Sequence, residues 1–450
     1  MSLGRQTRVP ARQRPGIPWR HSATQSVMAG LVVFLGTVTQ SPARFVYDAS
    51  TYWAGSVSLA HRRDFYVDGM LNLRGVLTSV LYVPAALATS VLGDSASGPA
   101  VLIENSLLVS LVGVLLLPRL LRAWGPVTPW MVWVCAGLTW LVGGRFAPYP
   151  LVDLWAAALM LAAVVALQRR TAIGLMGAGL LAGIAFNVRP AYLLPLLLTL
   201  VVVLLRQRLA GLWFAAGTVV ALVPQSMVNL RQGTGWKPWP PDMFALTQLQ
   251  AYNASFVVRY DTVVLPHRDP RQFFCNPFMA QAVGDHPPLS TGGLAGLYLH
   301  TLPQSIVFVA EKVAAALHWP LSAPYFAPTG AGDQMFALLV TIVSVLGVVA
   351  LVHAQSQSGF RSAPVAAWAV LAVWVGSLIT VVTPSPESRF ALPLVLLGIA
   401  GCATVVRGKL GSRWVAGAFM AVALVFAIGT EGLSHPAPPG PAFPATCAAR

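Results

Sequence analysis

Long uncharged apolar runs alternate with short polar turns along most of the 450-residue chain. Most of these runs hold roughly 17 to 20 residues, the length at which an α-helix crosses a hydrocarbon core of about 30 Å. The pattern therefore predicts an all-α, multi-pass transmembrane helix bundle. The runs lie at 24–41, 76–93, 101–118, 127–142, 151–167, 172–186, 190–205, 211–226, 334–352, 364–383, 389–406 and 414–430.

Arginine clusters between the runs indicate which turns face the cytoplasm, because positively charged loops are retained on that side. One assignment puts every cluster inside, provided that the run at 76–93 does not cross. It predicts about eleven spans, with the N-terminus inside and the C-terminus outside. All 14 carboxylates then fall outside or at outer helix ends. The clusters are Arg119 with Arg122, Arg169 with Arg170, Arg206 with Arg208, Arg361, and Arg407 with Lys409 and Arg413.

The run at 76–93 has features that set it apart from an ordinary span. It follows Arg74, contains Pro84 and ends at Gly93-Asp94. A helix that re-enters the membrane or lies on its outer surface accommodates such a start and such a break. We therefore expect this run on the extracytoplasmic side.

Two long segments lie outside in this topology, 42–100 and 227–333. The second is rich in proline, glycine and aromatic residues, and we expect short helices and loops there. Its apolar stretch 303–320 carries Glu311 and Lys312 at its middle. Because a span would bury both charges at a cost of several kcal/mol, a helix lying in the membrane interface is expected instead.

The transmembrane bundle, residues 21–431, is flanked by two polar ends. Residues 1–20 contain five arginines and no acid, which predicts a basic cytoplasmic tail ahead of a retained first span. Residues 432–450 are rich in proline and alanine and are predicted to be disordered.

Composition narrows the class of protein further. Hydrophobic residues make up 56% of the chain and charged residues only 10%, against about 25% charged in soluble domains. This excludes an ordinary cytosolic enzyme and, despite the net charge of +15, a nucleic-acid binder. The four cysteines indicate no disulfide framework, zinc site or redox pair: Cys135 and Cys402 fall in apolar runs, Cys275 and Cys447 in polar stretches.

The first candidate for chemistry is Asp48, seven residues past the first apolar run and followed by Tyr52 and Trp53. A carboxylate among aromatic residues at the membrane surface loses solvation, which raises its pKa and makes it a better base. Tyr52 shares its helical face if a helix begins near Asp48. The alternative is a solvated aspartate that caps this helix.

A second acid, Asp153, opens the run at 151–167 after a very short outer loop. An acid at a helix N-terminus is stabilised by the helix dipole, and this explanation needs no function. At membrane level, however, Asp153 could share a metal ion with Asp48 or help to orient a hydroxyl.

Three arginines border apolar runs on the predicted outer side: Arg74, Arg189 before Pro190, and Arg389 with Glu387 as a possible ion-pair partner. Each can be explained by snorkelling to lipid phosphate. Three arginines that reach one face from distant segments are better suited to binding a single phosphate group.

In chain order, these segments resemble the C-type glycosyltransferases (the GT-C fold), and most of all bacterial relatives of protein O-mannosyltransferases and of the lipid A aminoarabinose transferase. The similarity covers about residues 24–406. Many members have a Lys-Pro-Pro-Leu-like step where this chain has Arg74-Gly75-Val76-Leu77, so the prolines are missing and arginine replaces lysine. The matching segments are Tyr47-Asp48 through Tyr52-Trp53, Asp153 at the fourth span, Arg189-Pro190, Pro224-Gln225 with Asn229, and Glu387-Ser-Arg-Phe with the following Leu-Pro.

The resemblance implies an enzyme of the plasma membrane that moves a hexose or pentose, with inversion, from a polyprenyl-phosphate donor to an extracytoplasmic glycan, lipid or protein acceptor. Asp48 is then the general base, either directly or through a divalent metal such as Mg²⁺ or Mn²⁺ that Asp48 and Asp153 would hold. The remaining assignments are donor phosphate binding by Arg74, Arg189 and Arg389, and substrate contact by Tyr52, Trp53 and Glu387.

Simple chemistry agrees with this expectation. The leaving phosphate is already ionised, so it needs permanent positive charge more than it needs an acid. Three alternatives remain: an O-antigen ligase or polymerase with a diphosphate-linked donor, a transporter of lipid-linked sugars, and a non-catalytic membrane scaffold. The apolar runs contain few charges and no convincing internal repeat, which disfavours the transporter.

Overall fold

The computed structural model describes residues 19–62, 65, 73–263, 271–284, 288, 290–325, 330–359, 362–405, 411–434, 436–437 and 447. Most of the predicted basic tail lies outside these residues. The same holds for several charged residues of the predicted topology, namely Asp64, Asp68, Asp269, Asp285, Arg361, Arg407 and Lys409.

Helices make up most of the described chain, as the apolar runs predict. The α-helices are α1 (Trp19–Val38), α2 (Tyr47–Arg62), α3 (Val83–Leu92), α4 (Ser97–Leu111), α5 (Leu117–Leu121), α6 (Pro129–Gly143), α7 (Asp153–Ala166), α8 (Ala172–Val188), α9 (Leu193–Gln207), α10 (Leu212–Arg231), α11 (Met243–Ala254), α12 (Pro277–Val283), α13 (Thr291–His300), α14 (Leu302–Leu317), α15 (Ala331–Ser358), α16 (Val365–Val382), α17 (Leu392–Val405) and α18 (Ser412–Gly432). Short 3-10 turns are η2 (Val76–Val80), η3 (Asp94–Ala96), η5 (Gly144–Phe146), η6 (Pro190–Tyr192), η7 (Arg208–Gly211) and η8 (Ser388–Ala391), and one π-helical turn, η4 (Val112–Leu116), joins α4 to α5.

Six helical segments in the described part of the chain are long and apolar enough to cross a membrane. The pair α13 and α14, bent by 117°, makes a seventh if it acts as one span. Helices α1, α7 and α8 are apolar but shorter. The chain therefore forms a helical membrane bundle, while the number of about eleven spans stays a prediction. The six segments are Asp94–Leu121, Pro190–Arg231, Ala331–Gln357, Val365–Val382, Ser388–Val405 and Ser412–Gly432.

The segment Pro190–Arg231 contains two helices that run in opposite directions. A Cβ atom on Gly179 of α8 would lie 1.9 Å from the carbonyl oxygen of Phe214 in α10. Further along both helices, Asn187 Nδ2 donates to Gln225 Oε1 at 3.2 Å. Because the paired positions advance together along both helices, α8 and α10 run parallel. Helix α9, which connects them in the chain, runs in the opposite direction. The missing side chain of Gly179 permits this close helix contact.

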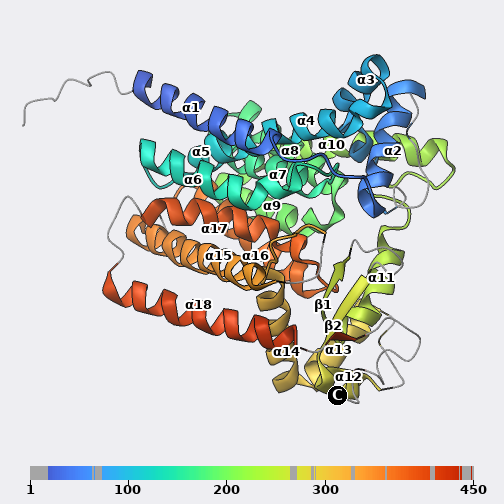
Figure 1. The fold of residues 1–450 in the computed structure, drawn as a ribbon, viewed down its shortest axis with the longest axis vertical. Coiled ribbons are helices and arrows are strands. Elements are labelled where there is room, and N and C mark those ends of the chain that lie inside the picture. The colour runs from blue at the N-terminus through green and yellow to red at the C-terminus, as the bar shows by residue number, and fades with distance from the viewer. Residues whose placement is uncertain are drawn as a thin grey trace, which may run out of the picture.

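The two ends of the bundle differ in what they carry (Figure 1). Helices α2, α3 and α11 to α14 and the strands lie at one end, named here the loop end. The opposite end holds the turns after α5, α7 and α9 and the start of α18. Contacts connect parts of this end: Gln168 Nε2, after α7, donates to the Arg119 carbonyl of α5 at 2.7 Å. Trp124 Nε1, after α5, donates to Gln355 Oε1 near the end of α15 at 2.9 Å. The described arginines of the predicted cytoplasmic clusters thus lie at the end opposite to the loop end.

A small antiparallel sheet at the loop end was not expected, since we predict only short helices and loops for 227–333. Strand β1 (Val257–Thr262) pairs with β2 (Arg271–Cys275), and β2 pairs with β3 (Pro436–Ala437). The β-branched valines that open β1 are buried and favour a pleated, packed strand. A search for long apolar runs misses strands this short, because polar residues interrupt them.

The predictions for the cysteines and for the C-terminal segment are wrong in the described parts. Cys275 and Cys447 form a disulfide across 172 positions of sequence. Strand β3 lies in the segment predicted to be disordered and pairs with Phe273 and Phe274 of β2. A pairing over such a separation leaves no mark on local cysteine spacing, and a proline-rich composition does not reveal tertiary partners.

Helix α14 lies at the loop end and buries the lysine for which we expect an interfacial position. Lys312 Nζ donates to the carbonyl oxygens of Ala254, Val382 and Pro384, at 2.8, 2.9 and 2.9 Å. Glu311 accepts a hydrogen bond from Asn276 Nδ2 at 2.7 Å. Both charges therefore have protein partners, and Lys312 connects α14 to the ends of α11 and α16.

The run predicted to stay on one side, 76–93, forms η2 and α3 at the loop end (Figure 1). The amide N–H of Ala85, near the start of α3, donates to Glu104 Oε2 of α4 at 3.2 Å. The break between the two short helices precedes Pro84, in agreement with the restriction that proline imposes on its neighbours.

Candidate active site at the loop end

Charged side chains from distant segments meet at the loop end, with Arg389 of η8 at their centre. Arg389 Nη2 donates to Asp48 Oδ2 of α2 at 2.6 Å, and Nη1 lies 3.9 Å from Asp153 Oδ2 of α7. Its Nε pairs with Glu387. Only 5% of the Arg389 side chain is exposed, so these groups compensate one another where water screens them little.

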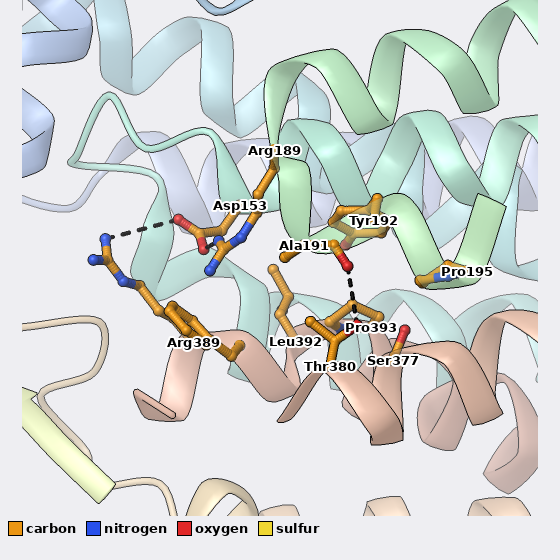
Figure 2. A pocket seen from close by; sticks show the side chains of 11 residues that line it. Asp153, Arg189, Ala191, Tyr192, Pro195, Ser377, Thr380, Arg389, Leu392 and Pro393 are labelled. Carbon is orange, nitrogen blue, oxygen red and sulfur yellow. Dashed lines mark hydrogen bonds and ion pairs between the residues drawn. The ribbon is translucent and has the colours of Figure 1, made fainter. Parts of the chain in front are cut away.

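Arg189, at the end of α8, completes this cluster from the other side of Asp153. Figure 2 shows the Asp153 carboxylate between the guanidinium groups of Arg189 and Arg389, and Arg189 forms an ion pair with it. The Arg189 guanidinium also lies 4.6 Å from the centre of the Phe390 ring. A following proline disfavours helical backbone dihedrals at Arg189. The backbone of Arg189 is extended (φ −141°, ψ 105°) and ends α8.

Arg74 approaches the cluster from the loop before η2. Its Nε donates to the hydroxyl of Tyr52 at 3.1 Å, and Asp48 and Tyr52 are four residues apart on α2, as expected for a shared face. The helix begins at Tyr47, so Asp48 lies in its first turn and is not its N-cap. Within the described residues, Arg74 is the arginine of the three that has no carboxylate at ion-pair distance.

The electrostatic surroundings of Asp48 contradict our expectation of a raised pKa. Burial by itself raises the pKa of this carboxyl, but the positive charges of Arg389, Arg74 and Arg189 outweigh it. The pKa of Asp48 therefore lies below its ordinary value, and the group is fully ionised at neutral pH. Desolvation is the only influence on Asp48 that can be inferred from sequence, because the hydrogen-bond partner Arg389 is 341 positions away.

A small cavity adjoins the three charged groups in Figure 2 and continues between α9, α16 and α17. The centre of a water molecule can occupy about 10 Å³ of it, which corresponds to about one water molecule. The space on this side of the cluster is thus narrow, whereas 19% of the Asp48 side chain is exposed. A ligand reaches Asp48 more easily than it reaches Asp153.

The predicted sharing of a metal ion by Asp48 and Asp153 does not fit this donor set. The guanidinium of Arg389 reaches both carboxylates and supplies the positive charge that a shared ion would bring. Over the described residues, no group of three histidine, cysteine or acidic side chains could hold a metal ion. We therefore derive no step through Mg²⁺ or Mn²⁺.

Strand β1 brings residues to the site that the sequence analysis missed. The N–H of Tyr260 donates to the Pro386 carbonyl at 3.1 Å, and Thr262 Oγ1 donates to Glu387 Oε1 at 3.2 Å. Asp261 is buried beside Arg259, with 2.7 Å between Oδ2 and Nη2. Burial, only partly offset by Arg259, raises the pKa of Asp261 to about 6.

Tyrosine rings flank the start of α2 next to Asp48. The hydroxyl of Tyr325 accepts a hydrogen bond from the Ala49 N–H at 3.4 Å. Its ring lies 6.1 Å from that of Tyr47 and 4.9 Å from that of Tyr149, measured between centroids. The segment 323–325 could not be connected to Asp48 from sequence alone.

Two residues assigned to substrate contact have other neighbours. Trp53 packs against Phe45, with 5.4 Å between ring centroids, in an apolar cluster that also contains Tyr82. Tyr52 is 1% exposed and its hydroxyl binds Arg74. Their roles toward a substrate stay predictions, whereas Glu387 lies within the ion-pair cluster.

Comparison with known proteins does not identify a family. No protein-family model matches the chain, and a search of the curated proteins finds no match either.

Proposed function

We propose that this protein is an integral membrane glycosyltransferase that transfers a sugar from a polyprenyl-phosphate donor to an acceptor hydroxyl at the loop end of the bundle. The observation that carries this proposal is the meeting of Asp48 with Arg74, Arg189 and Arg389 at one end of an apolar helix bundle. A donor with a lipid tail has to react at membrane level, and the cluster lies where the helices end.

The arginines are suited to the phosphate of such a donor. Guanidinium groups keep their charge at all relevant pH values and bind phosphate oxygens in pairs. In the structure, Arg189 and Arg389 hold carboxylates instead, while Arg74 binds a phenol. A donor phosphate would first meet Arg74 and then compete with Asp48 for Arg389.

Asp48 then serves as the base. The oxygen of the acceptor bonds to the anomeric carbon, the bond from that carbon to the phosphate oxygen breaks, and Asp48 takes the hydroxyl proton. The polyprenyl phosphate leaves with its electron pair and is stabilised by the arginines. Because this is a single displacement, the product has inverted configuration.

The proposed location is the plasma membrane, with the N-terminus in the cytoplasm and the loop end outside. The arginine clusters at the opposite end support this orientation, since such clusters are retained in the cytoplasm. The disulfide between Cys275 and Cys447 at the loop end also supports it, because disulfides persist in oxidising compartments.

The proposal is tested with purified protein in lipid nanodiscs and a panel of polyprenyl-phosphate hexoses and pentoses. Each is offered with extracted envelope glycans, lipids and peptides as acceptors, and products are detected by mass spectrometry. We expect transfer by the wild type and a loss of at least about a hundred-fold for Asp48→Asn, the usual contribution of a general base.

The matched control is Asp94→Asn, which removes an exposed carboxylate at the same end of the bundle and should leave turnover unchanged. Normal turnover by a folded Asp48→Asn variant would disprove the assignment of the base. Activity with polyprenyl-diphosphate donors alone would instead support the ligase or polymerase alternative.

A further inference from the structure

Three buried amide side chains form a continuous hydrogen-bonded chain beside the arginines. Asn187 Nδ2 donates to Gln225 Oε1 at 3.2 Å, and Gln225 Nε2 donates to Asn229 Oδ1 at 3.0 Å. Asn229 Nδ2 in turn donates to the carbonyl oxygens of Lys237 and Trp239, at 2.8 and 2.9 Å. The three side chains are at most 1% exposed.

This chain of amides binds the backbone that follows Arg74. The N–H groups of Gly75, Val76 and Leu77 donate to the Asn187 carbonyl, Gln225 Oε1 and Asn187 Oδ1, at 2.8, 2.9 and 3.0 Å. These are the free N–H groups at the start of η2, which a short helix cannot satisfy by itself. The amide chain therefore fixes where η2 begins and the position of the backbone from which the Arg74 side chain extends.

Glycine at position 75 is required by this contact. A Cβ atom there would lie 2.1 Å from the Asn187 carbonyl oxygen and 2.2 Å from its Oδ1. No side chain fits at such distances, so the backbone after Arg74 lies directly on α8.

The same chain also connects two of the arginines to each other. Asn187 lies in the last turn of α8, two residues before Arg189. It binds Gln225, which accepts a hydrogen bond from the N–H of Val76, two residues after Arg74. Each oxygen and each amide nitrogen in the chain has a partner, so a rotation of one amide would cost hydrogen bonds at its neighbours.

We propose that Gln225 is a positioning residue that sets the separation of the Arg74 and Arg189 guanidinium groups, and thereby the affinity of the site for a phosphate ester. This inference rests on the proposed function, because it assumes that both arginines bind the donor phosphate. Gln225 acts through the groups that it binds, which are Val76, Asn187 and Asn229.

The test measures the affinity of the full-length protein in nanodiscs for dodecyl phosphate, a soluble ester with a lipid-like tail. Gln225→Met keeps the approximate volume of the side chain and removes its hydrogen bonds. We expect about ten-fold weaker binding, a free-energy change of the size of one buried hydrogen bond. Ser226→Ala, the next buried position of α10 with a bond only to the Leu222 carbonyl in its own helix, should bind like the wild type.

A double-mutant cycle with Arg74→Gln separates positioning from general damage to the fold. If Gln225 acts through Arg74, then adding Gln225→Met to Arg74→Gln weakens binding by less than two-fold. Equal and additive losses in both backgrounds, or normal affinity of the folded Gln225→Met variant, would overturn the inference and leave the proposed function intact.

Gln225→Glu adds a pH readout to these affinity measurements. While protonated, the introduced carboxyl can accept from Val76 and Asn187 and donate to Asn229, as the amide does. Once the carboxyl is ionised, one of its oxygens faces Asn229 Oδ1, and two acceptors repel each other. The Asn229 amide cannot rotate to present its nitrogen, because it would lose the hydrogen bonds to the Lys237 and Trp239 carbonyl oxygens. The affinity of the variant relative to the wild type should therefore fall as the pH rises, and a ratio independent of pH would contradict the inference.

Wild-type protein that shows no affinity for dodecyl phosphate would overturn the proposed function together with this inference. The two failures are thus distinguishable. The inference alone fails in a protein whose wild type binds dodecyl phosphate more tightly than its Arg74→Gln variant does, whereas the proposed function fails in a protein whose wild type does not bind.

Discussion

At the scale of single residues, the site depends on the arginines that compensate the negative charge of Asp48. Asp48 could be selected from sequence as an acid near the membrane surface, and so could Arg74, Arg189 and Arg389. Their pairing could not, because Arg389 reaches Asp48 across 341 positions. The sign of the pKa shift follows from this pairing, and for that reason it was predicted wrongly.

The lowered pKa of Asp48 leads to a prediction about pH dependence. In the free protein the arginines keep the pKa of Asp48 below its ordinary value, so the acidic limb of kcat/KM should lie below the pH at which an ordinary aspartate titrates. A bound donor phosphate neutralises part of this positive charge and raises the pKa. The acidic limb of kcat should therefore lie at higher pH than that of kcat/KM.

Steady-state kinetics from pH 3.5 to 8, on protein whose fold is verified at each pH, would locate the kcat limb and show whether kcat/KM falls at the same pH. A kcat limb at the same or a lower pH than the kcat/KM limb would contradict the proposal that the phosphate takes over the arginines that Asp48 holds.

At the scale of elements, the apolar runs predict most helices of the bundle, since length and hydropathy are local properties. Local pattern does not reveal the sheet, whose strands β1 and β2 have six and five residues. It also cannot show that Lys312 of α14 is buried against the carbonyl oxygens of two other helices and a turn. Partners that come from distant segments decide both cases.

Helices α15 and α17 pack closely at glycines, which predicts how a methyl group added there affects stability. A Cβ atom on Gly401 would lie 1.9 Å from the Gly347 carbonyl oxygen, so Gly401→Ala must push the helices apart. We expect a destabilisation of about 1–3 kcal/mol, measured as a lower unfolding midpoint in detergent. Gly137→Ala in α6 meets nothing within 4 Å and should be neutral or slightly stabilising. Equal midpoints for the two variants would show that the contact is not close.

At the scale of the whole molecule, charge is distributed unevenly along the bundle. The carboxylates Asp48, Asp153, Asp261 and Glu387 lie at the loop end, where arginines pair with them. The predicted cytoplasmic arginine clusters occupy the opposite end, as far as the structure describes them. Such a distribution was predicted from sequence because retention of positive loops acts on each turn separately. The sequence thus predicts which segments lie at each end of the bundle. The contacts between segments within one end are seen only in the structure.

The proposed orientation predicts which cysteines a membrane-impermeant maleimide reaches on intact cells. Ser95→Cys places a thiol in η3 at the loop end, and Ala210→Cys places one in the turn between α9 and α10; both positions are exposed. In a Cys402→Ala background, buried Cys135 and the disulfide-bonded Cys275 and Cys447 should not react. We expect Ser95→Cys to be labelled directly and Ala210→Cys only after permeabilisation, because five predicted spans separate the two positions. Labelling of both from the same side would mean an even number of crossings between them, and the arginine clusters would then no longer define a single cytoplasmic face.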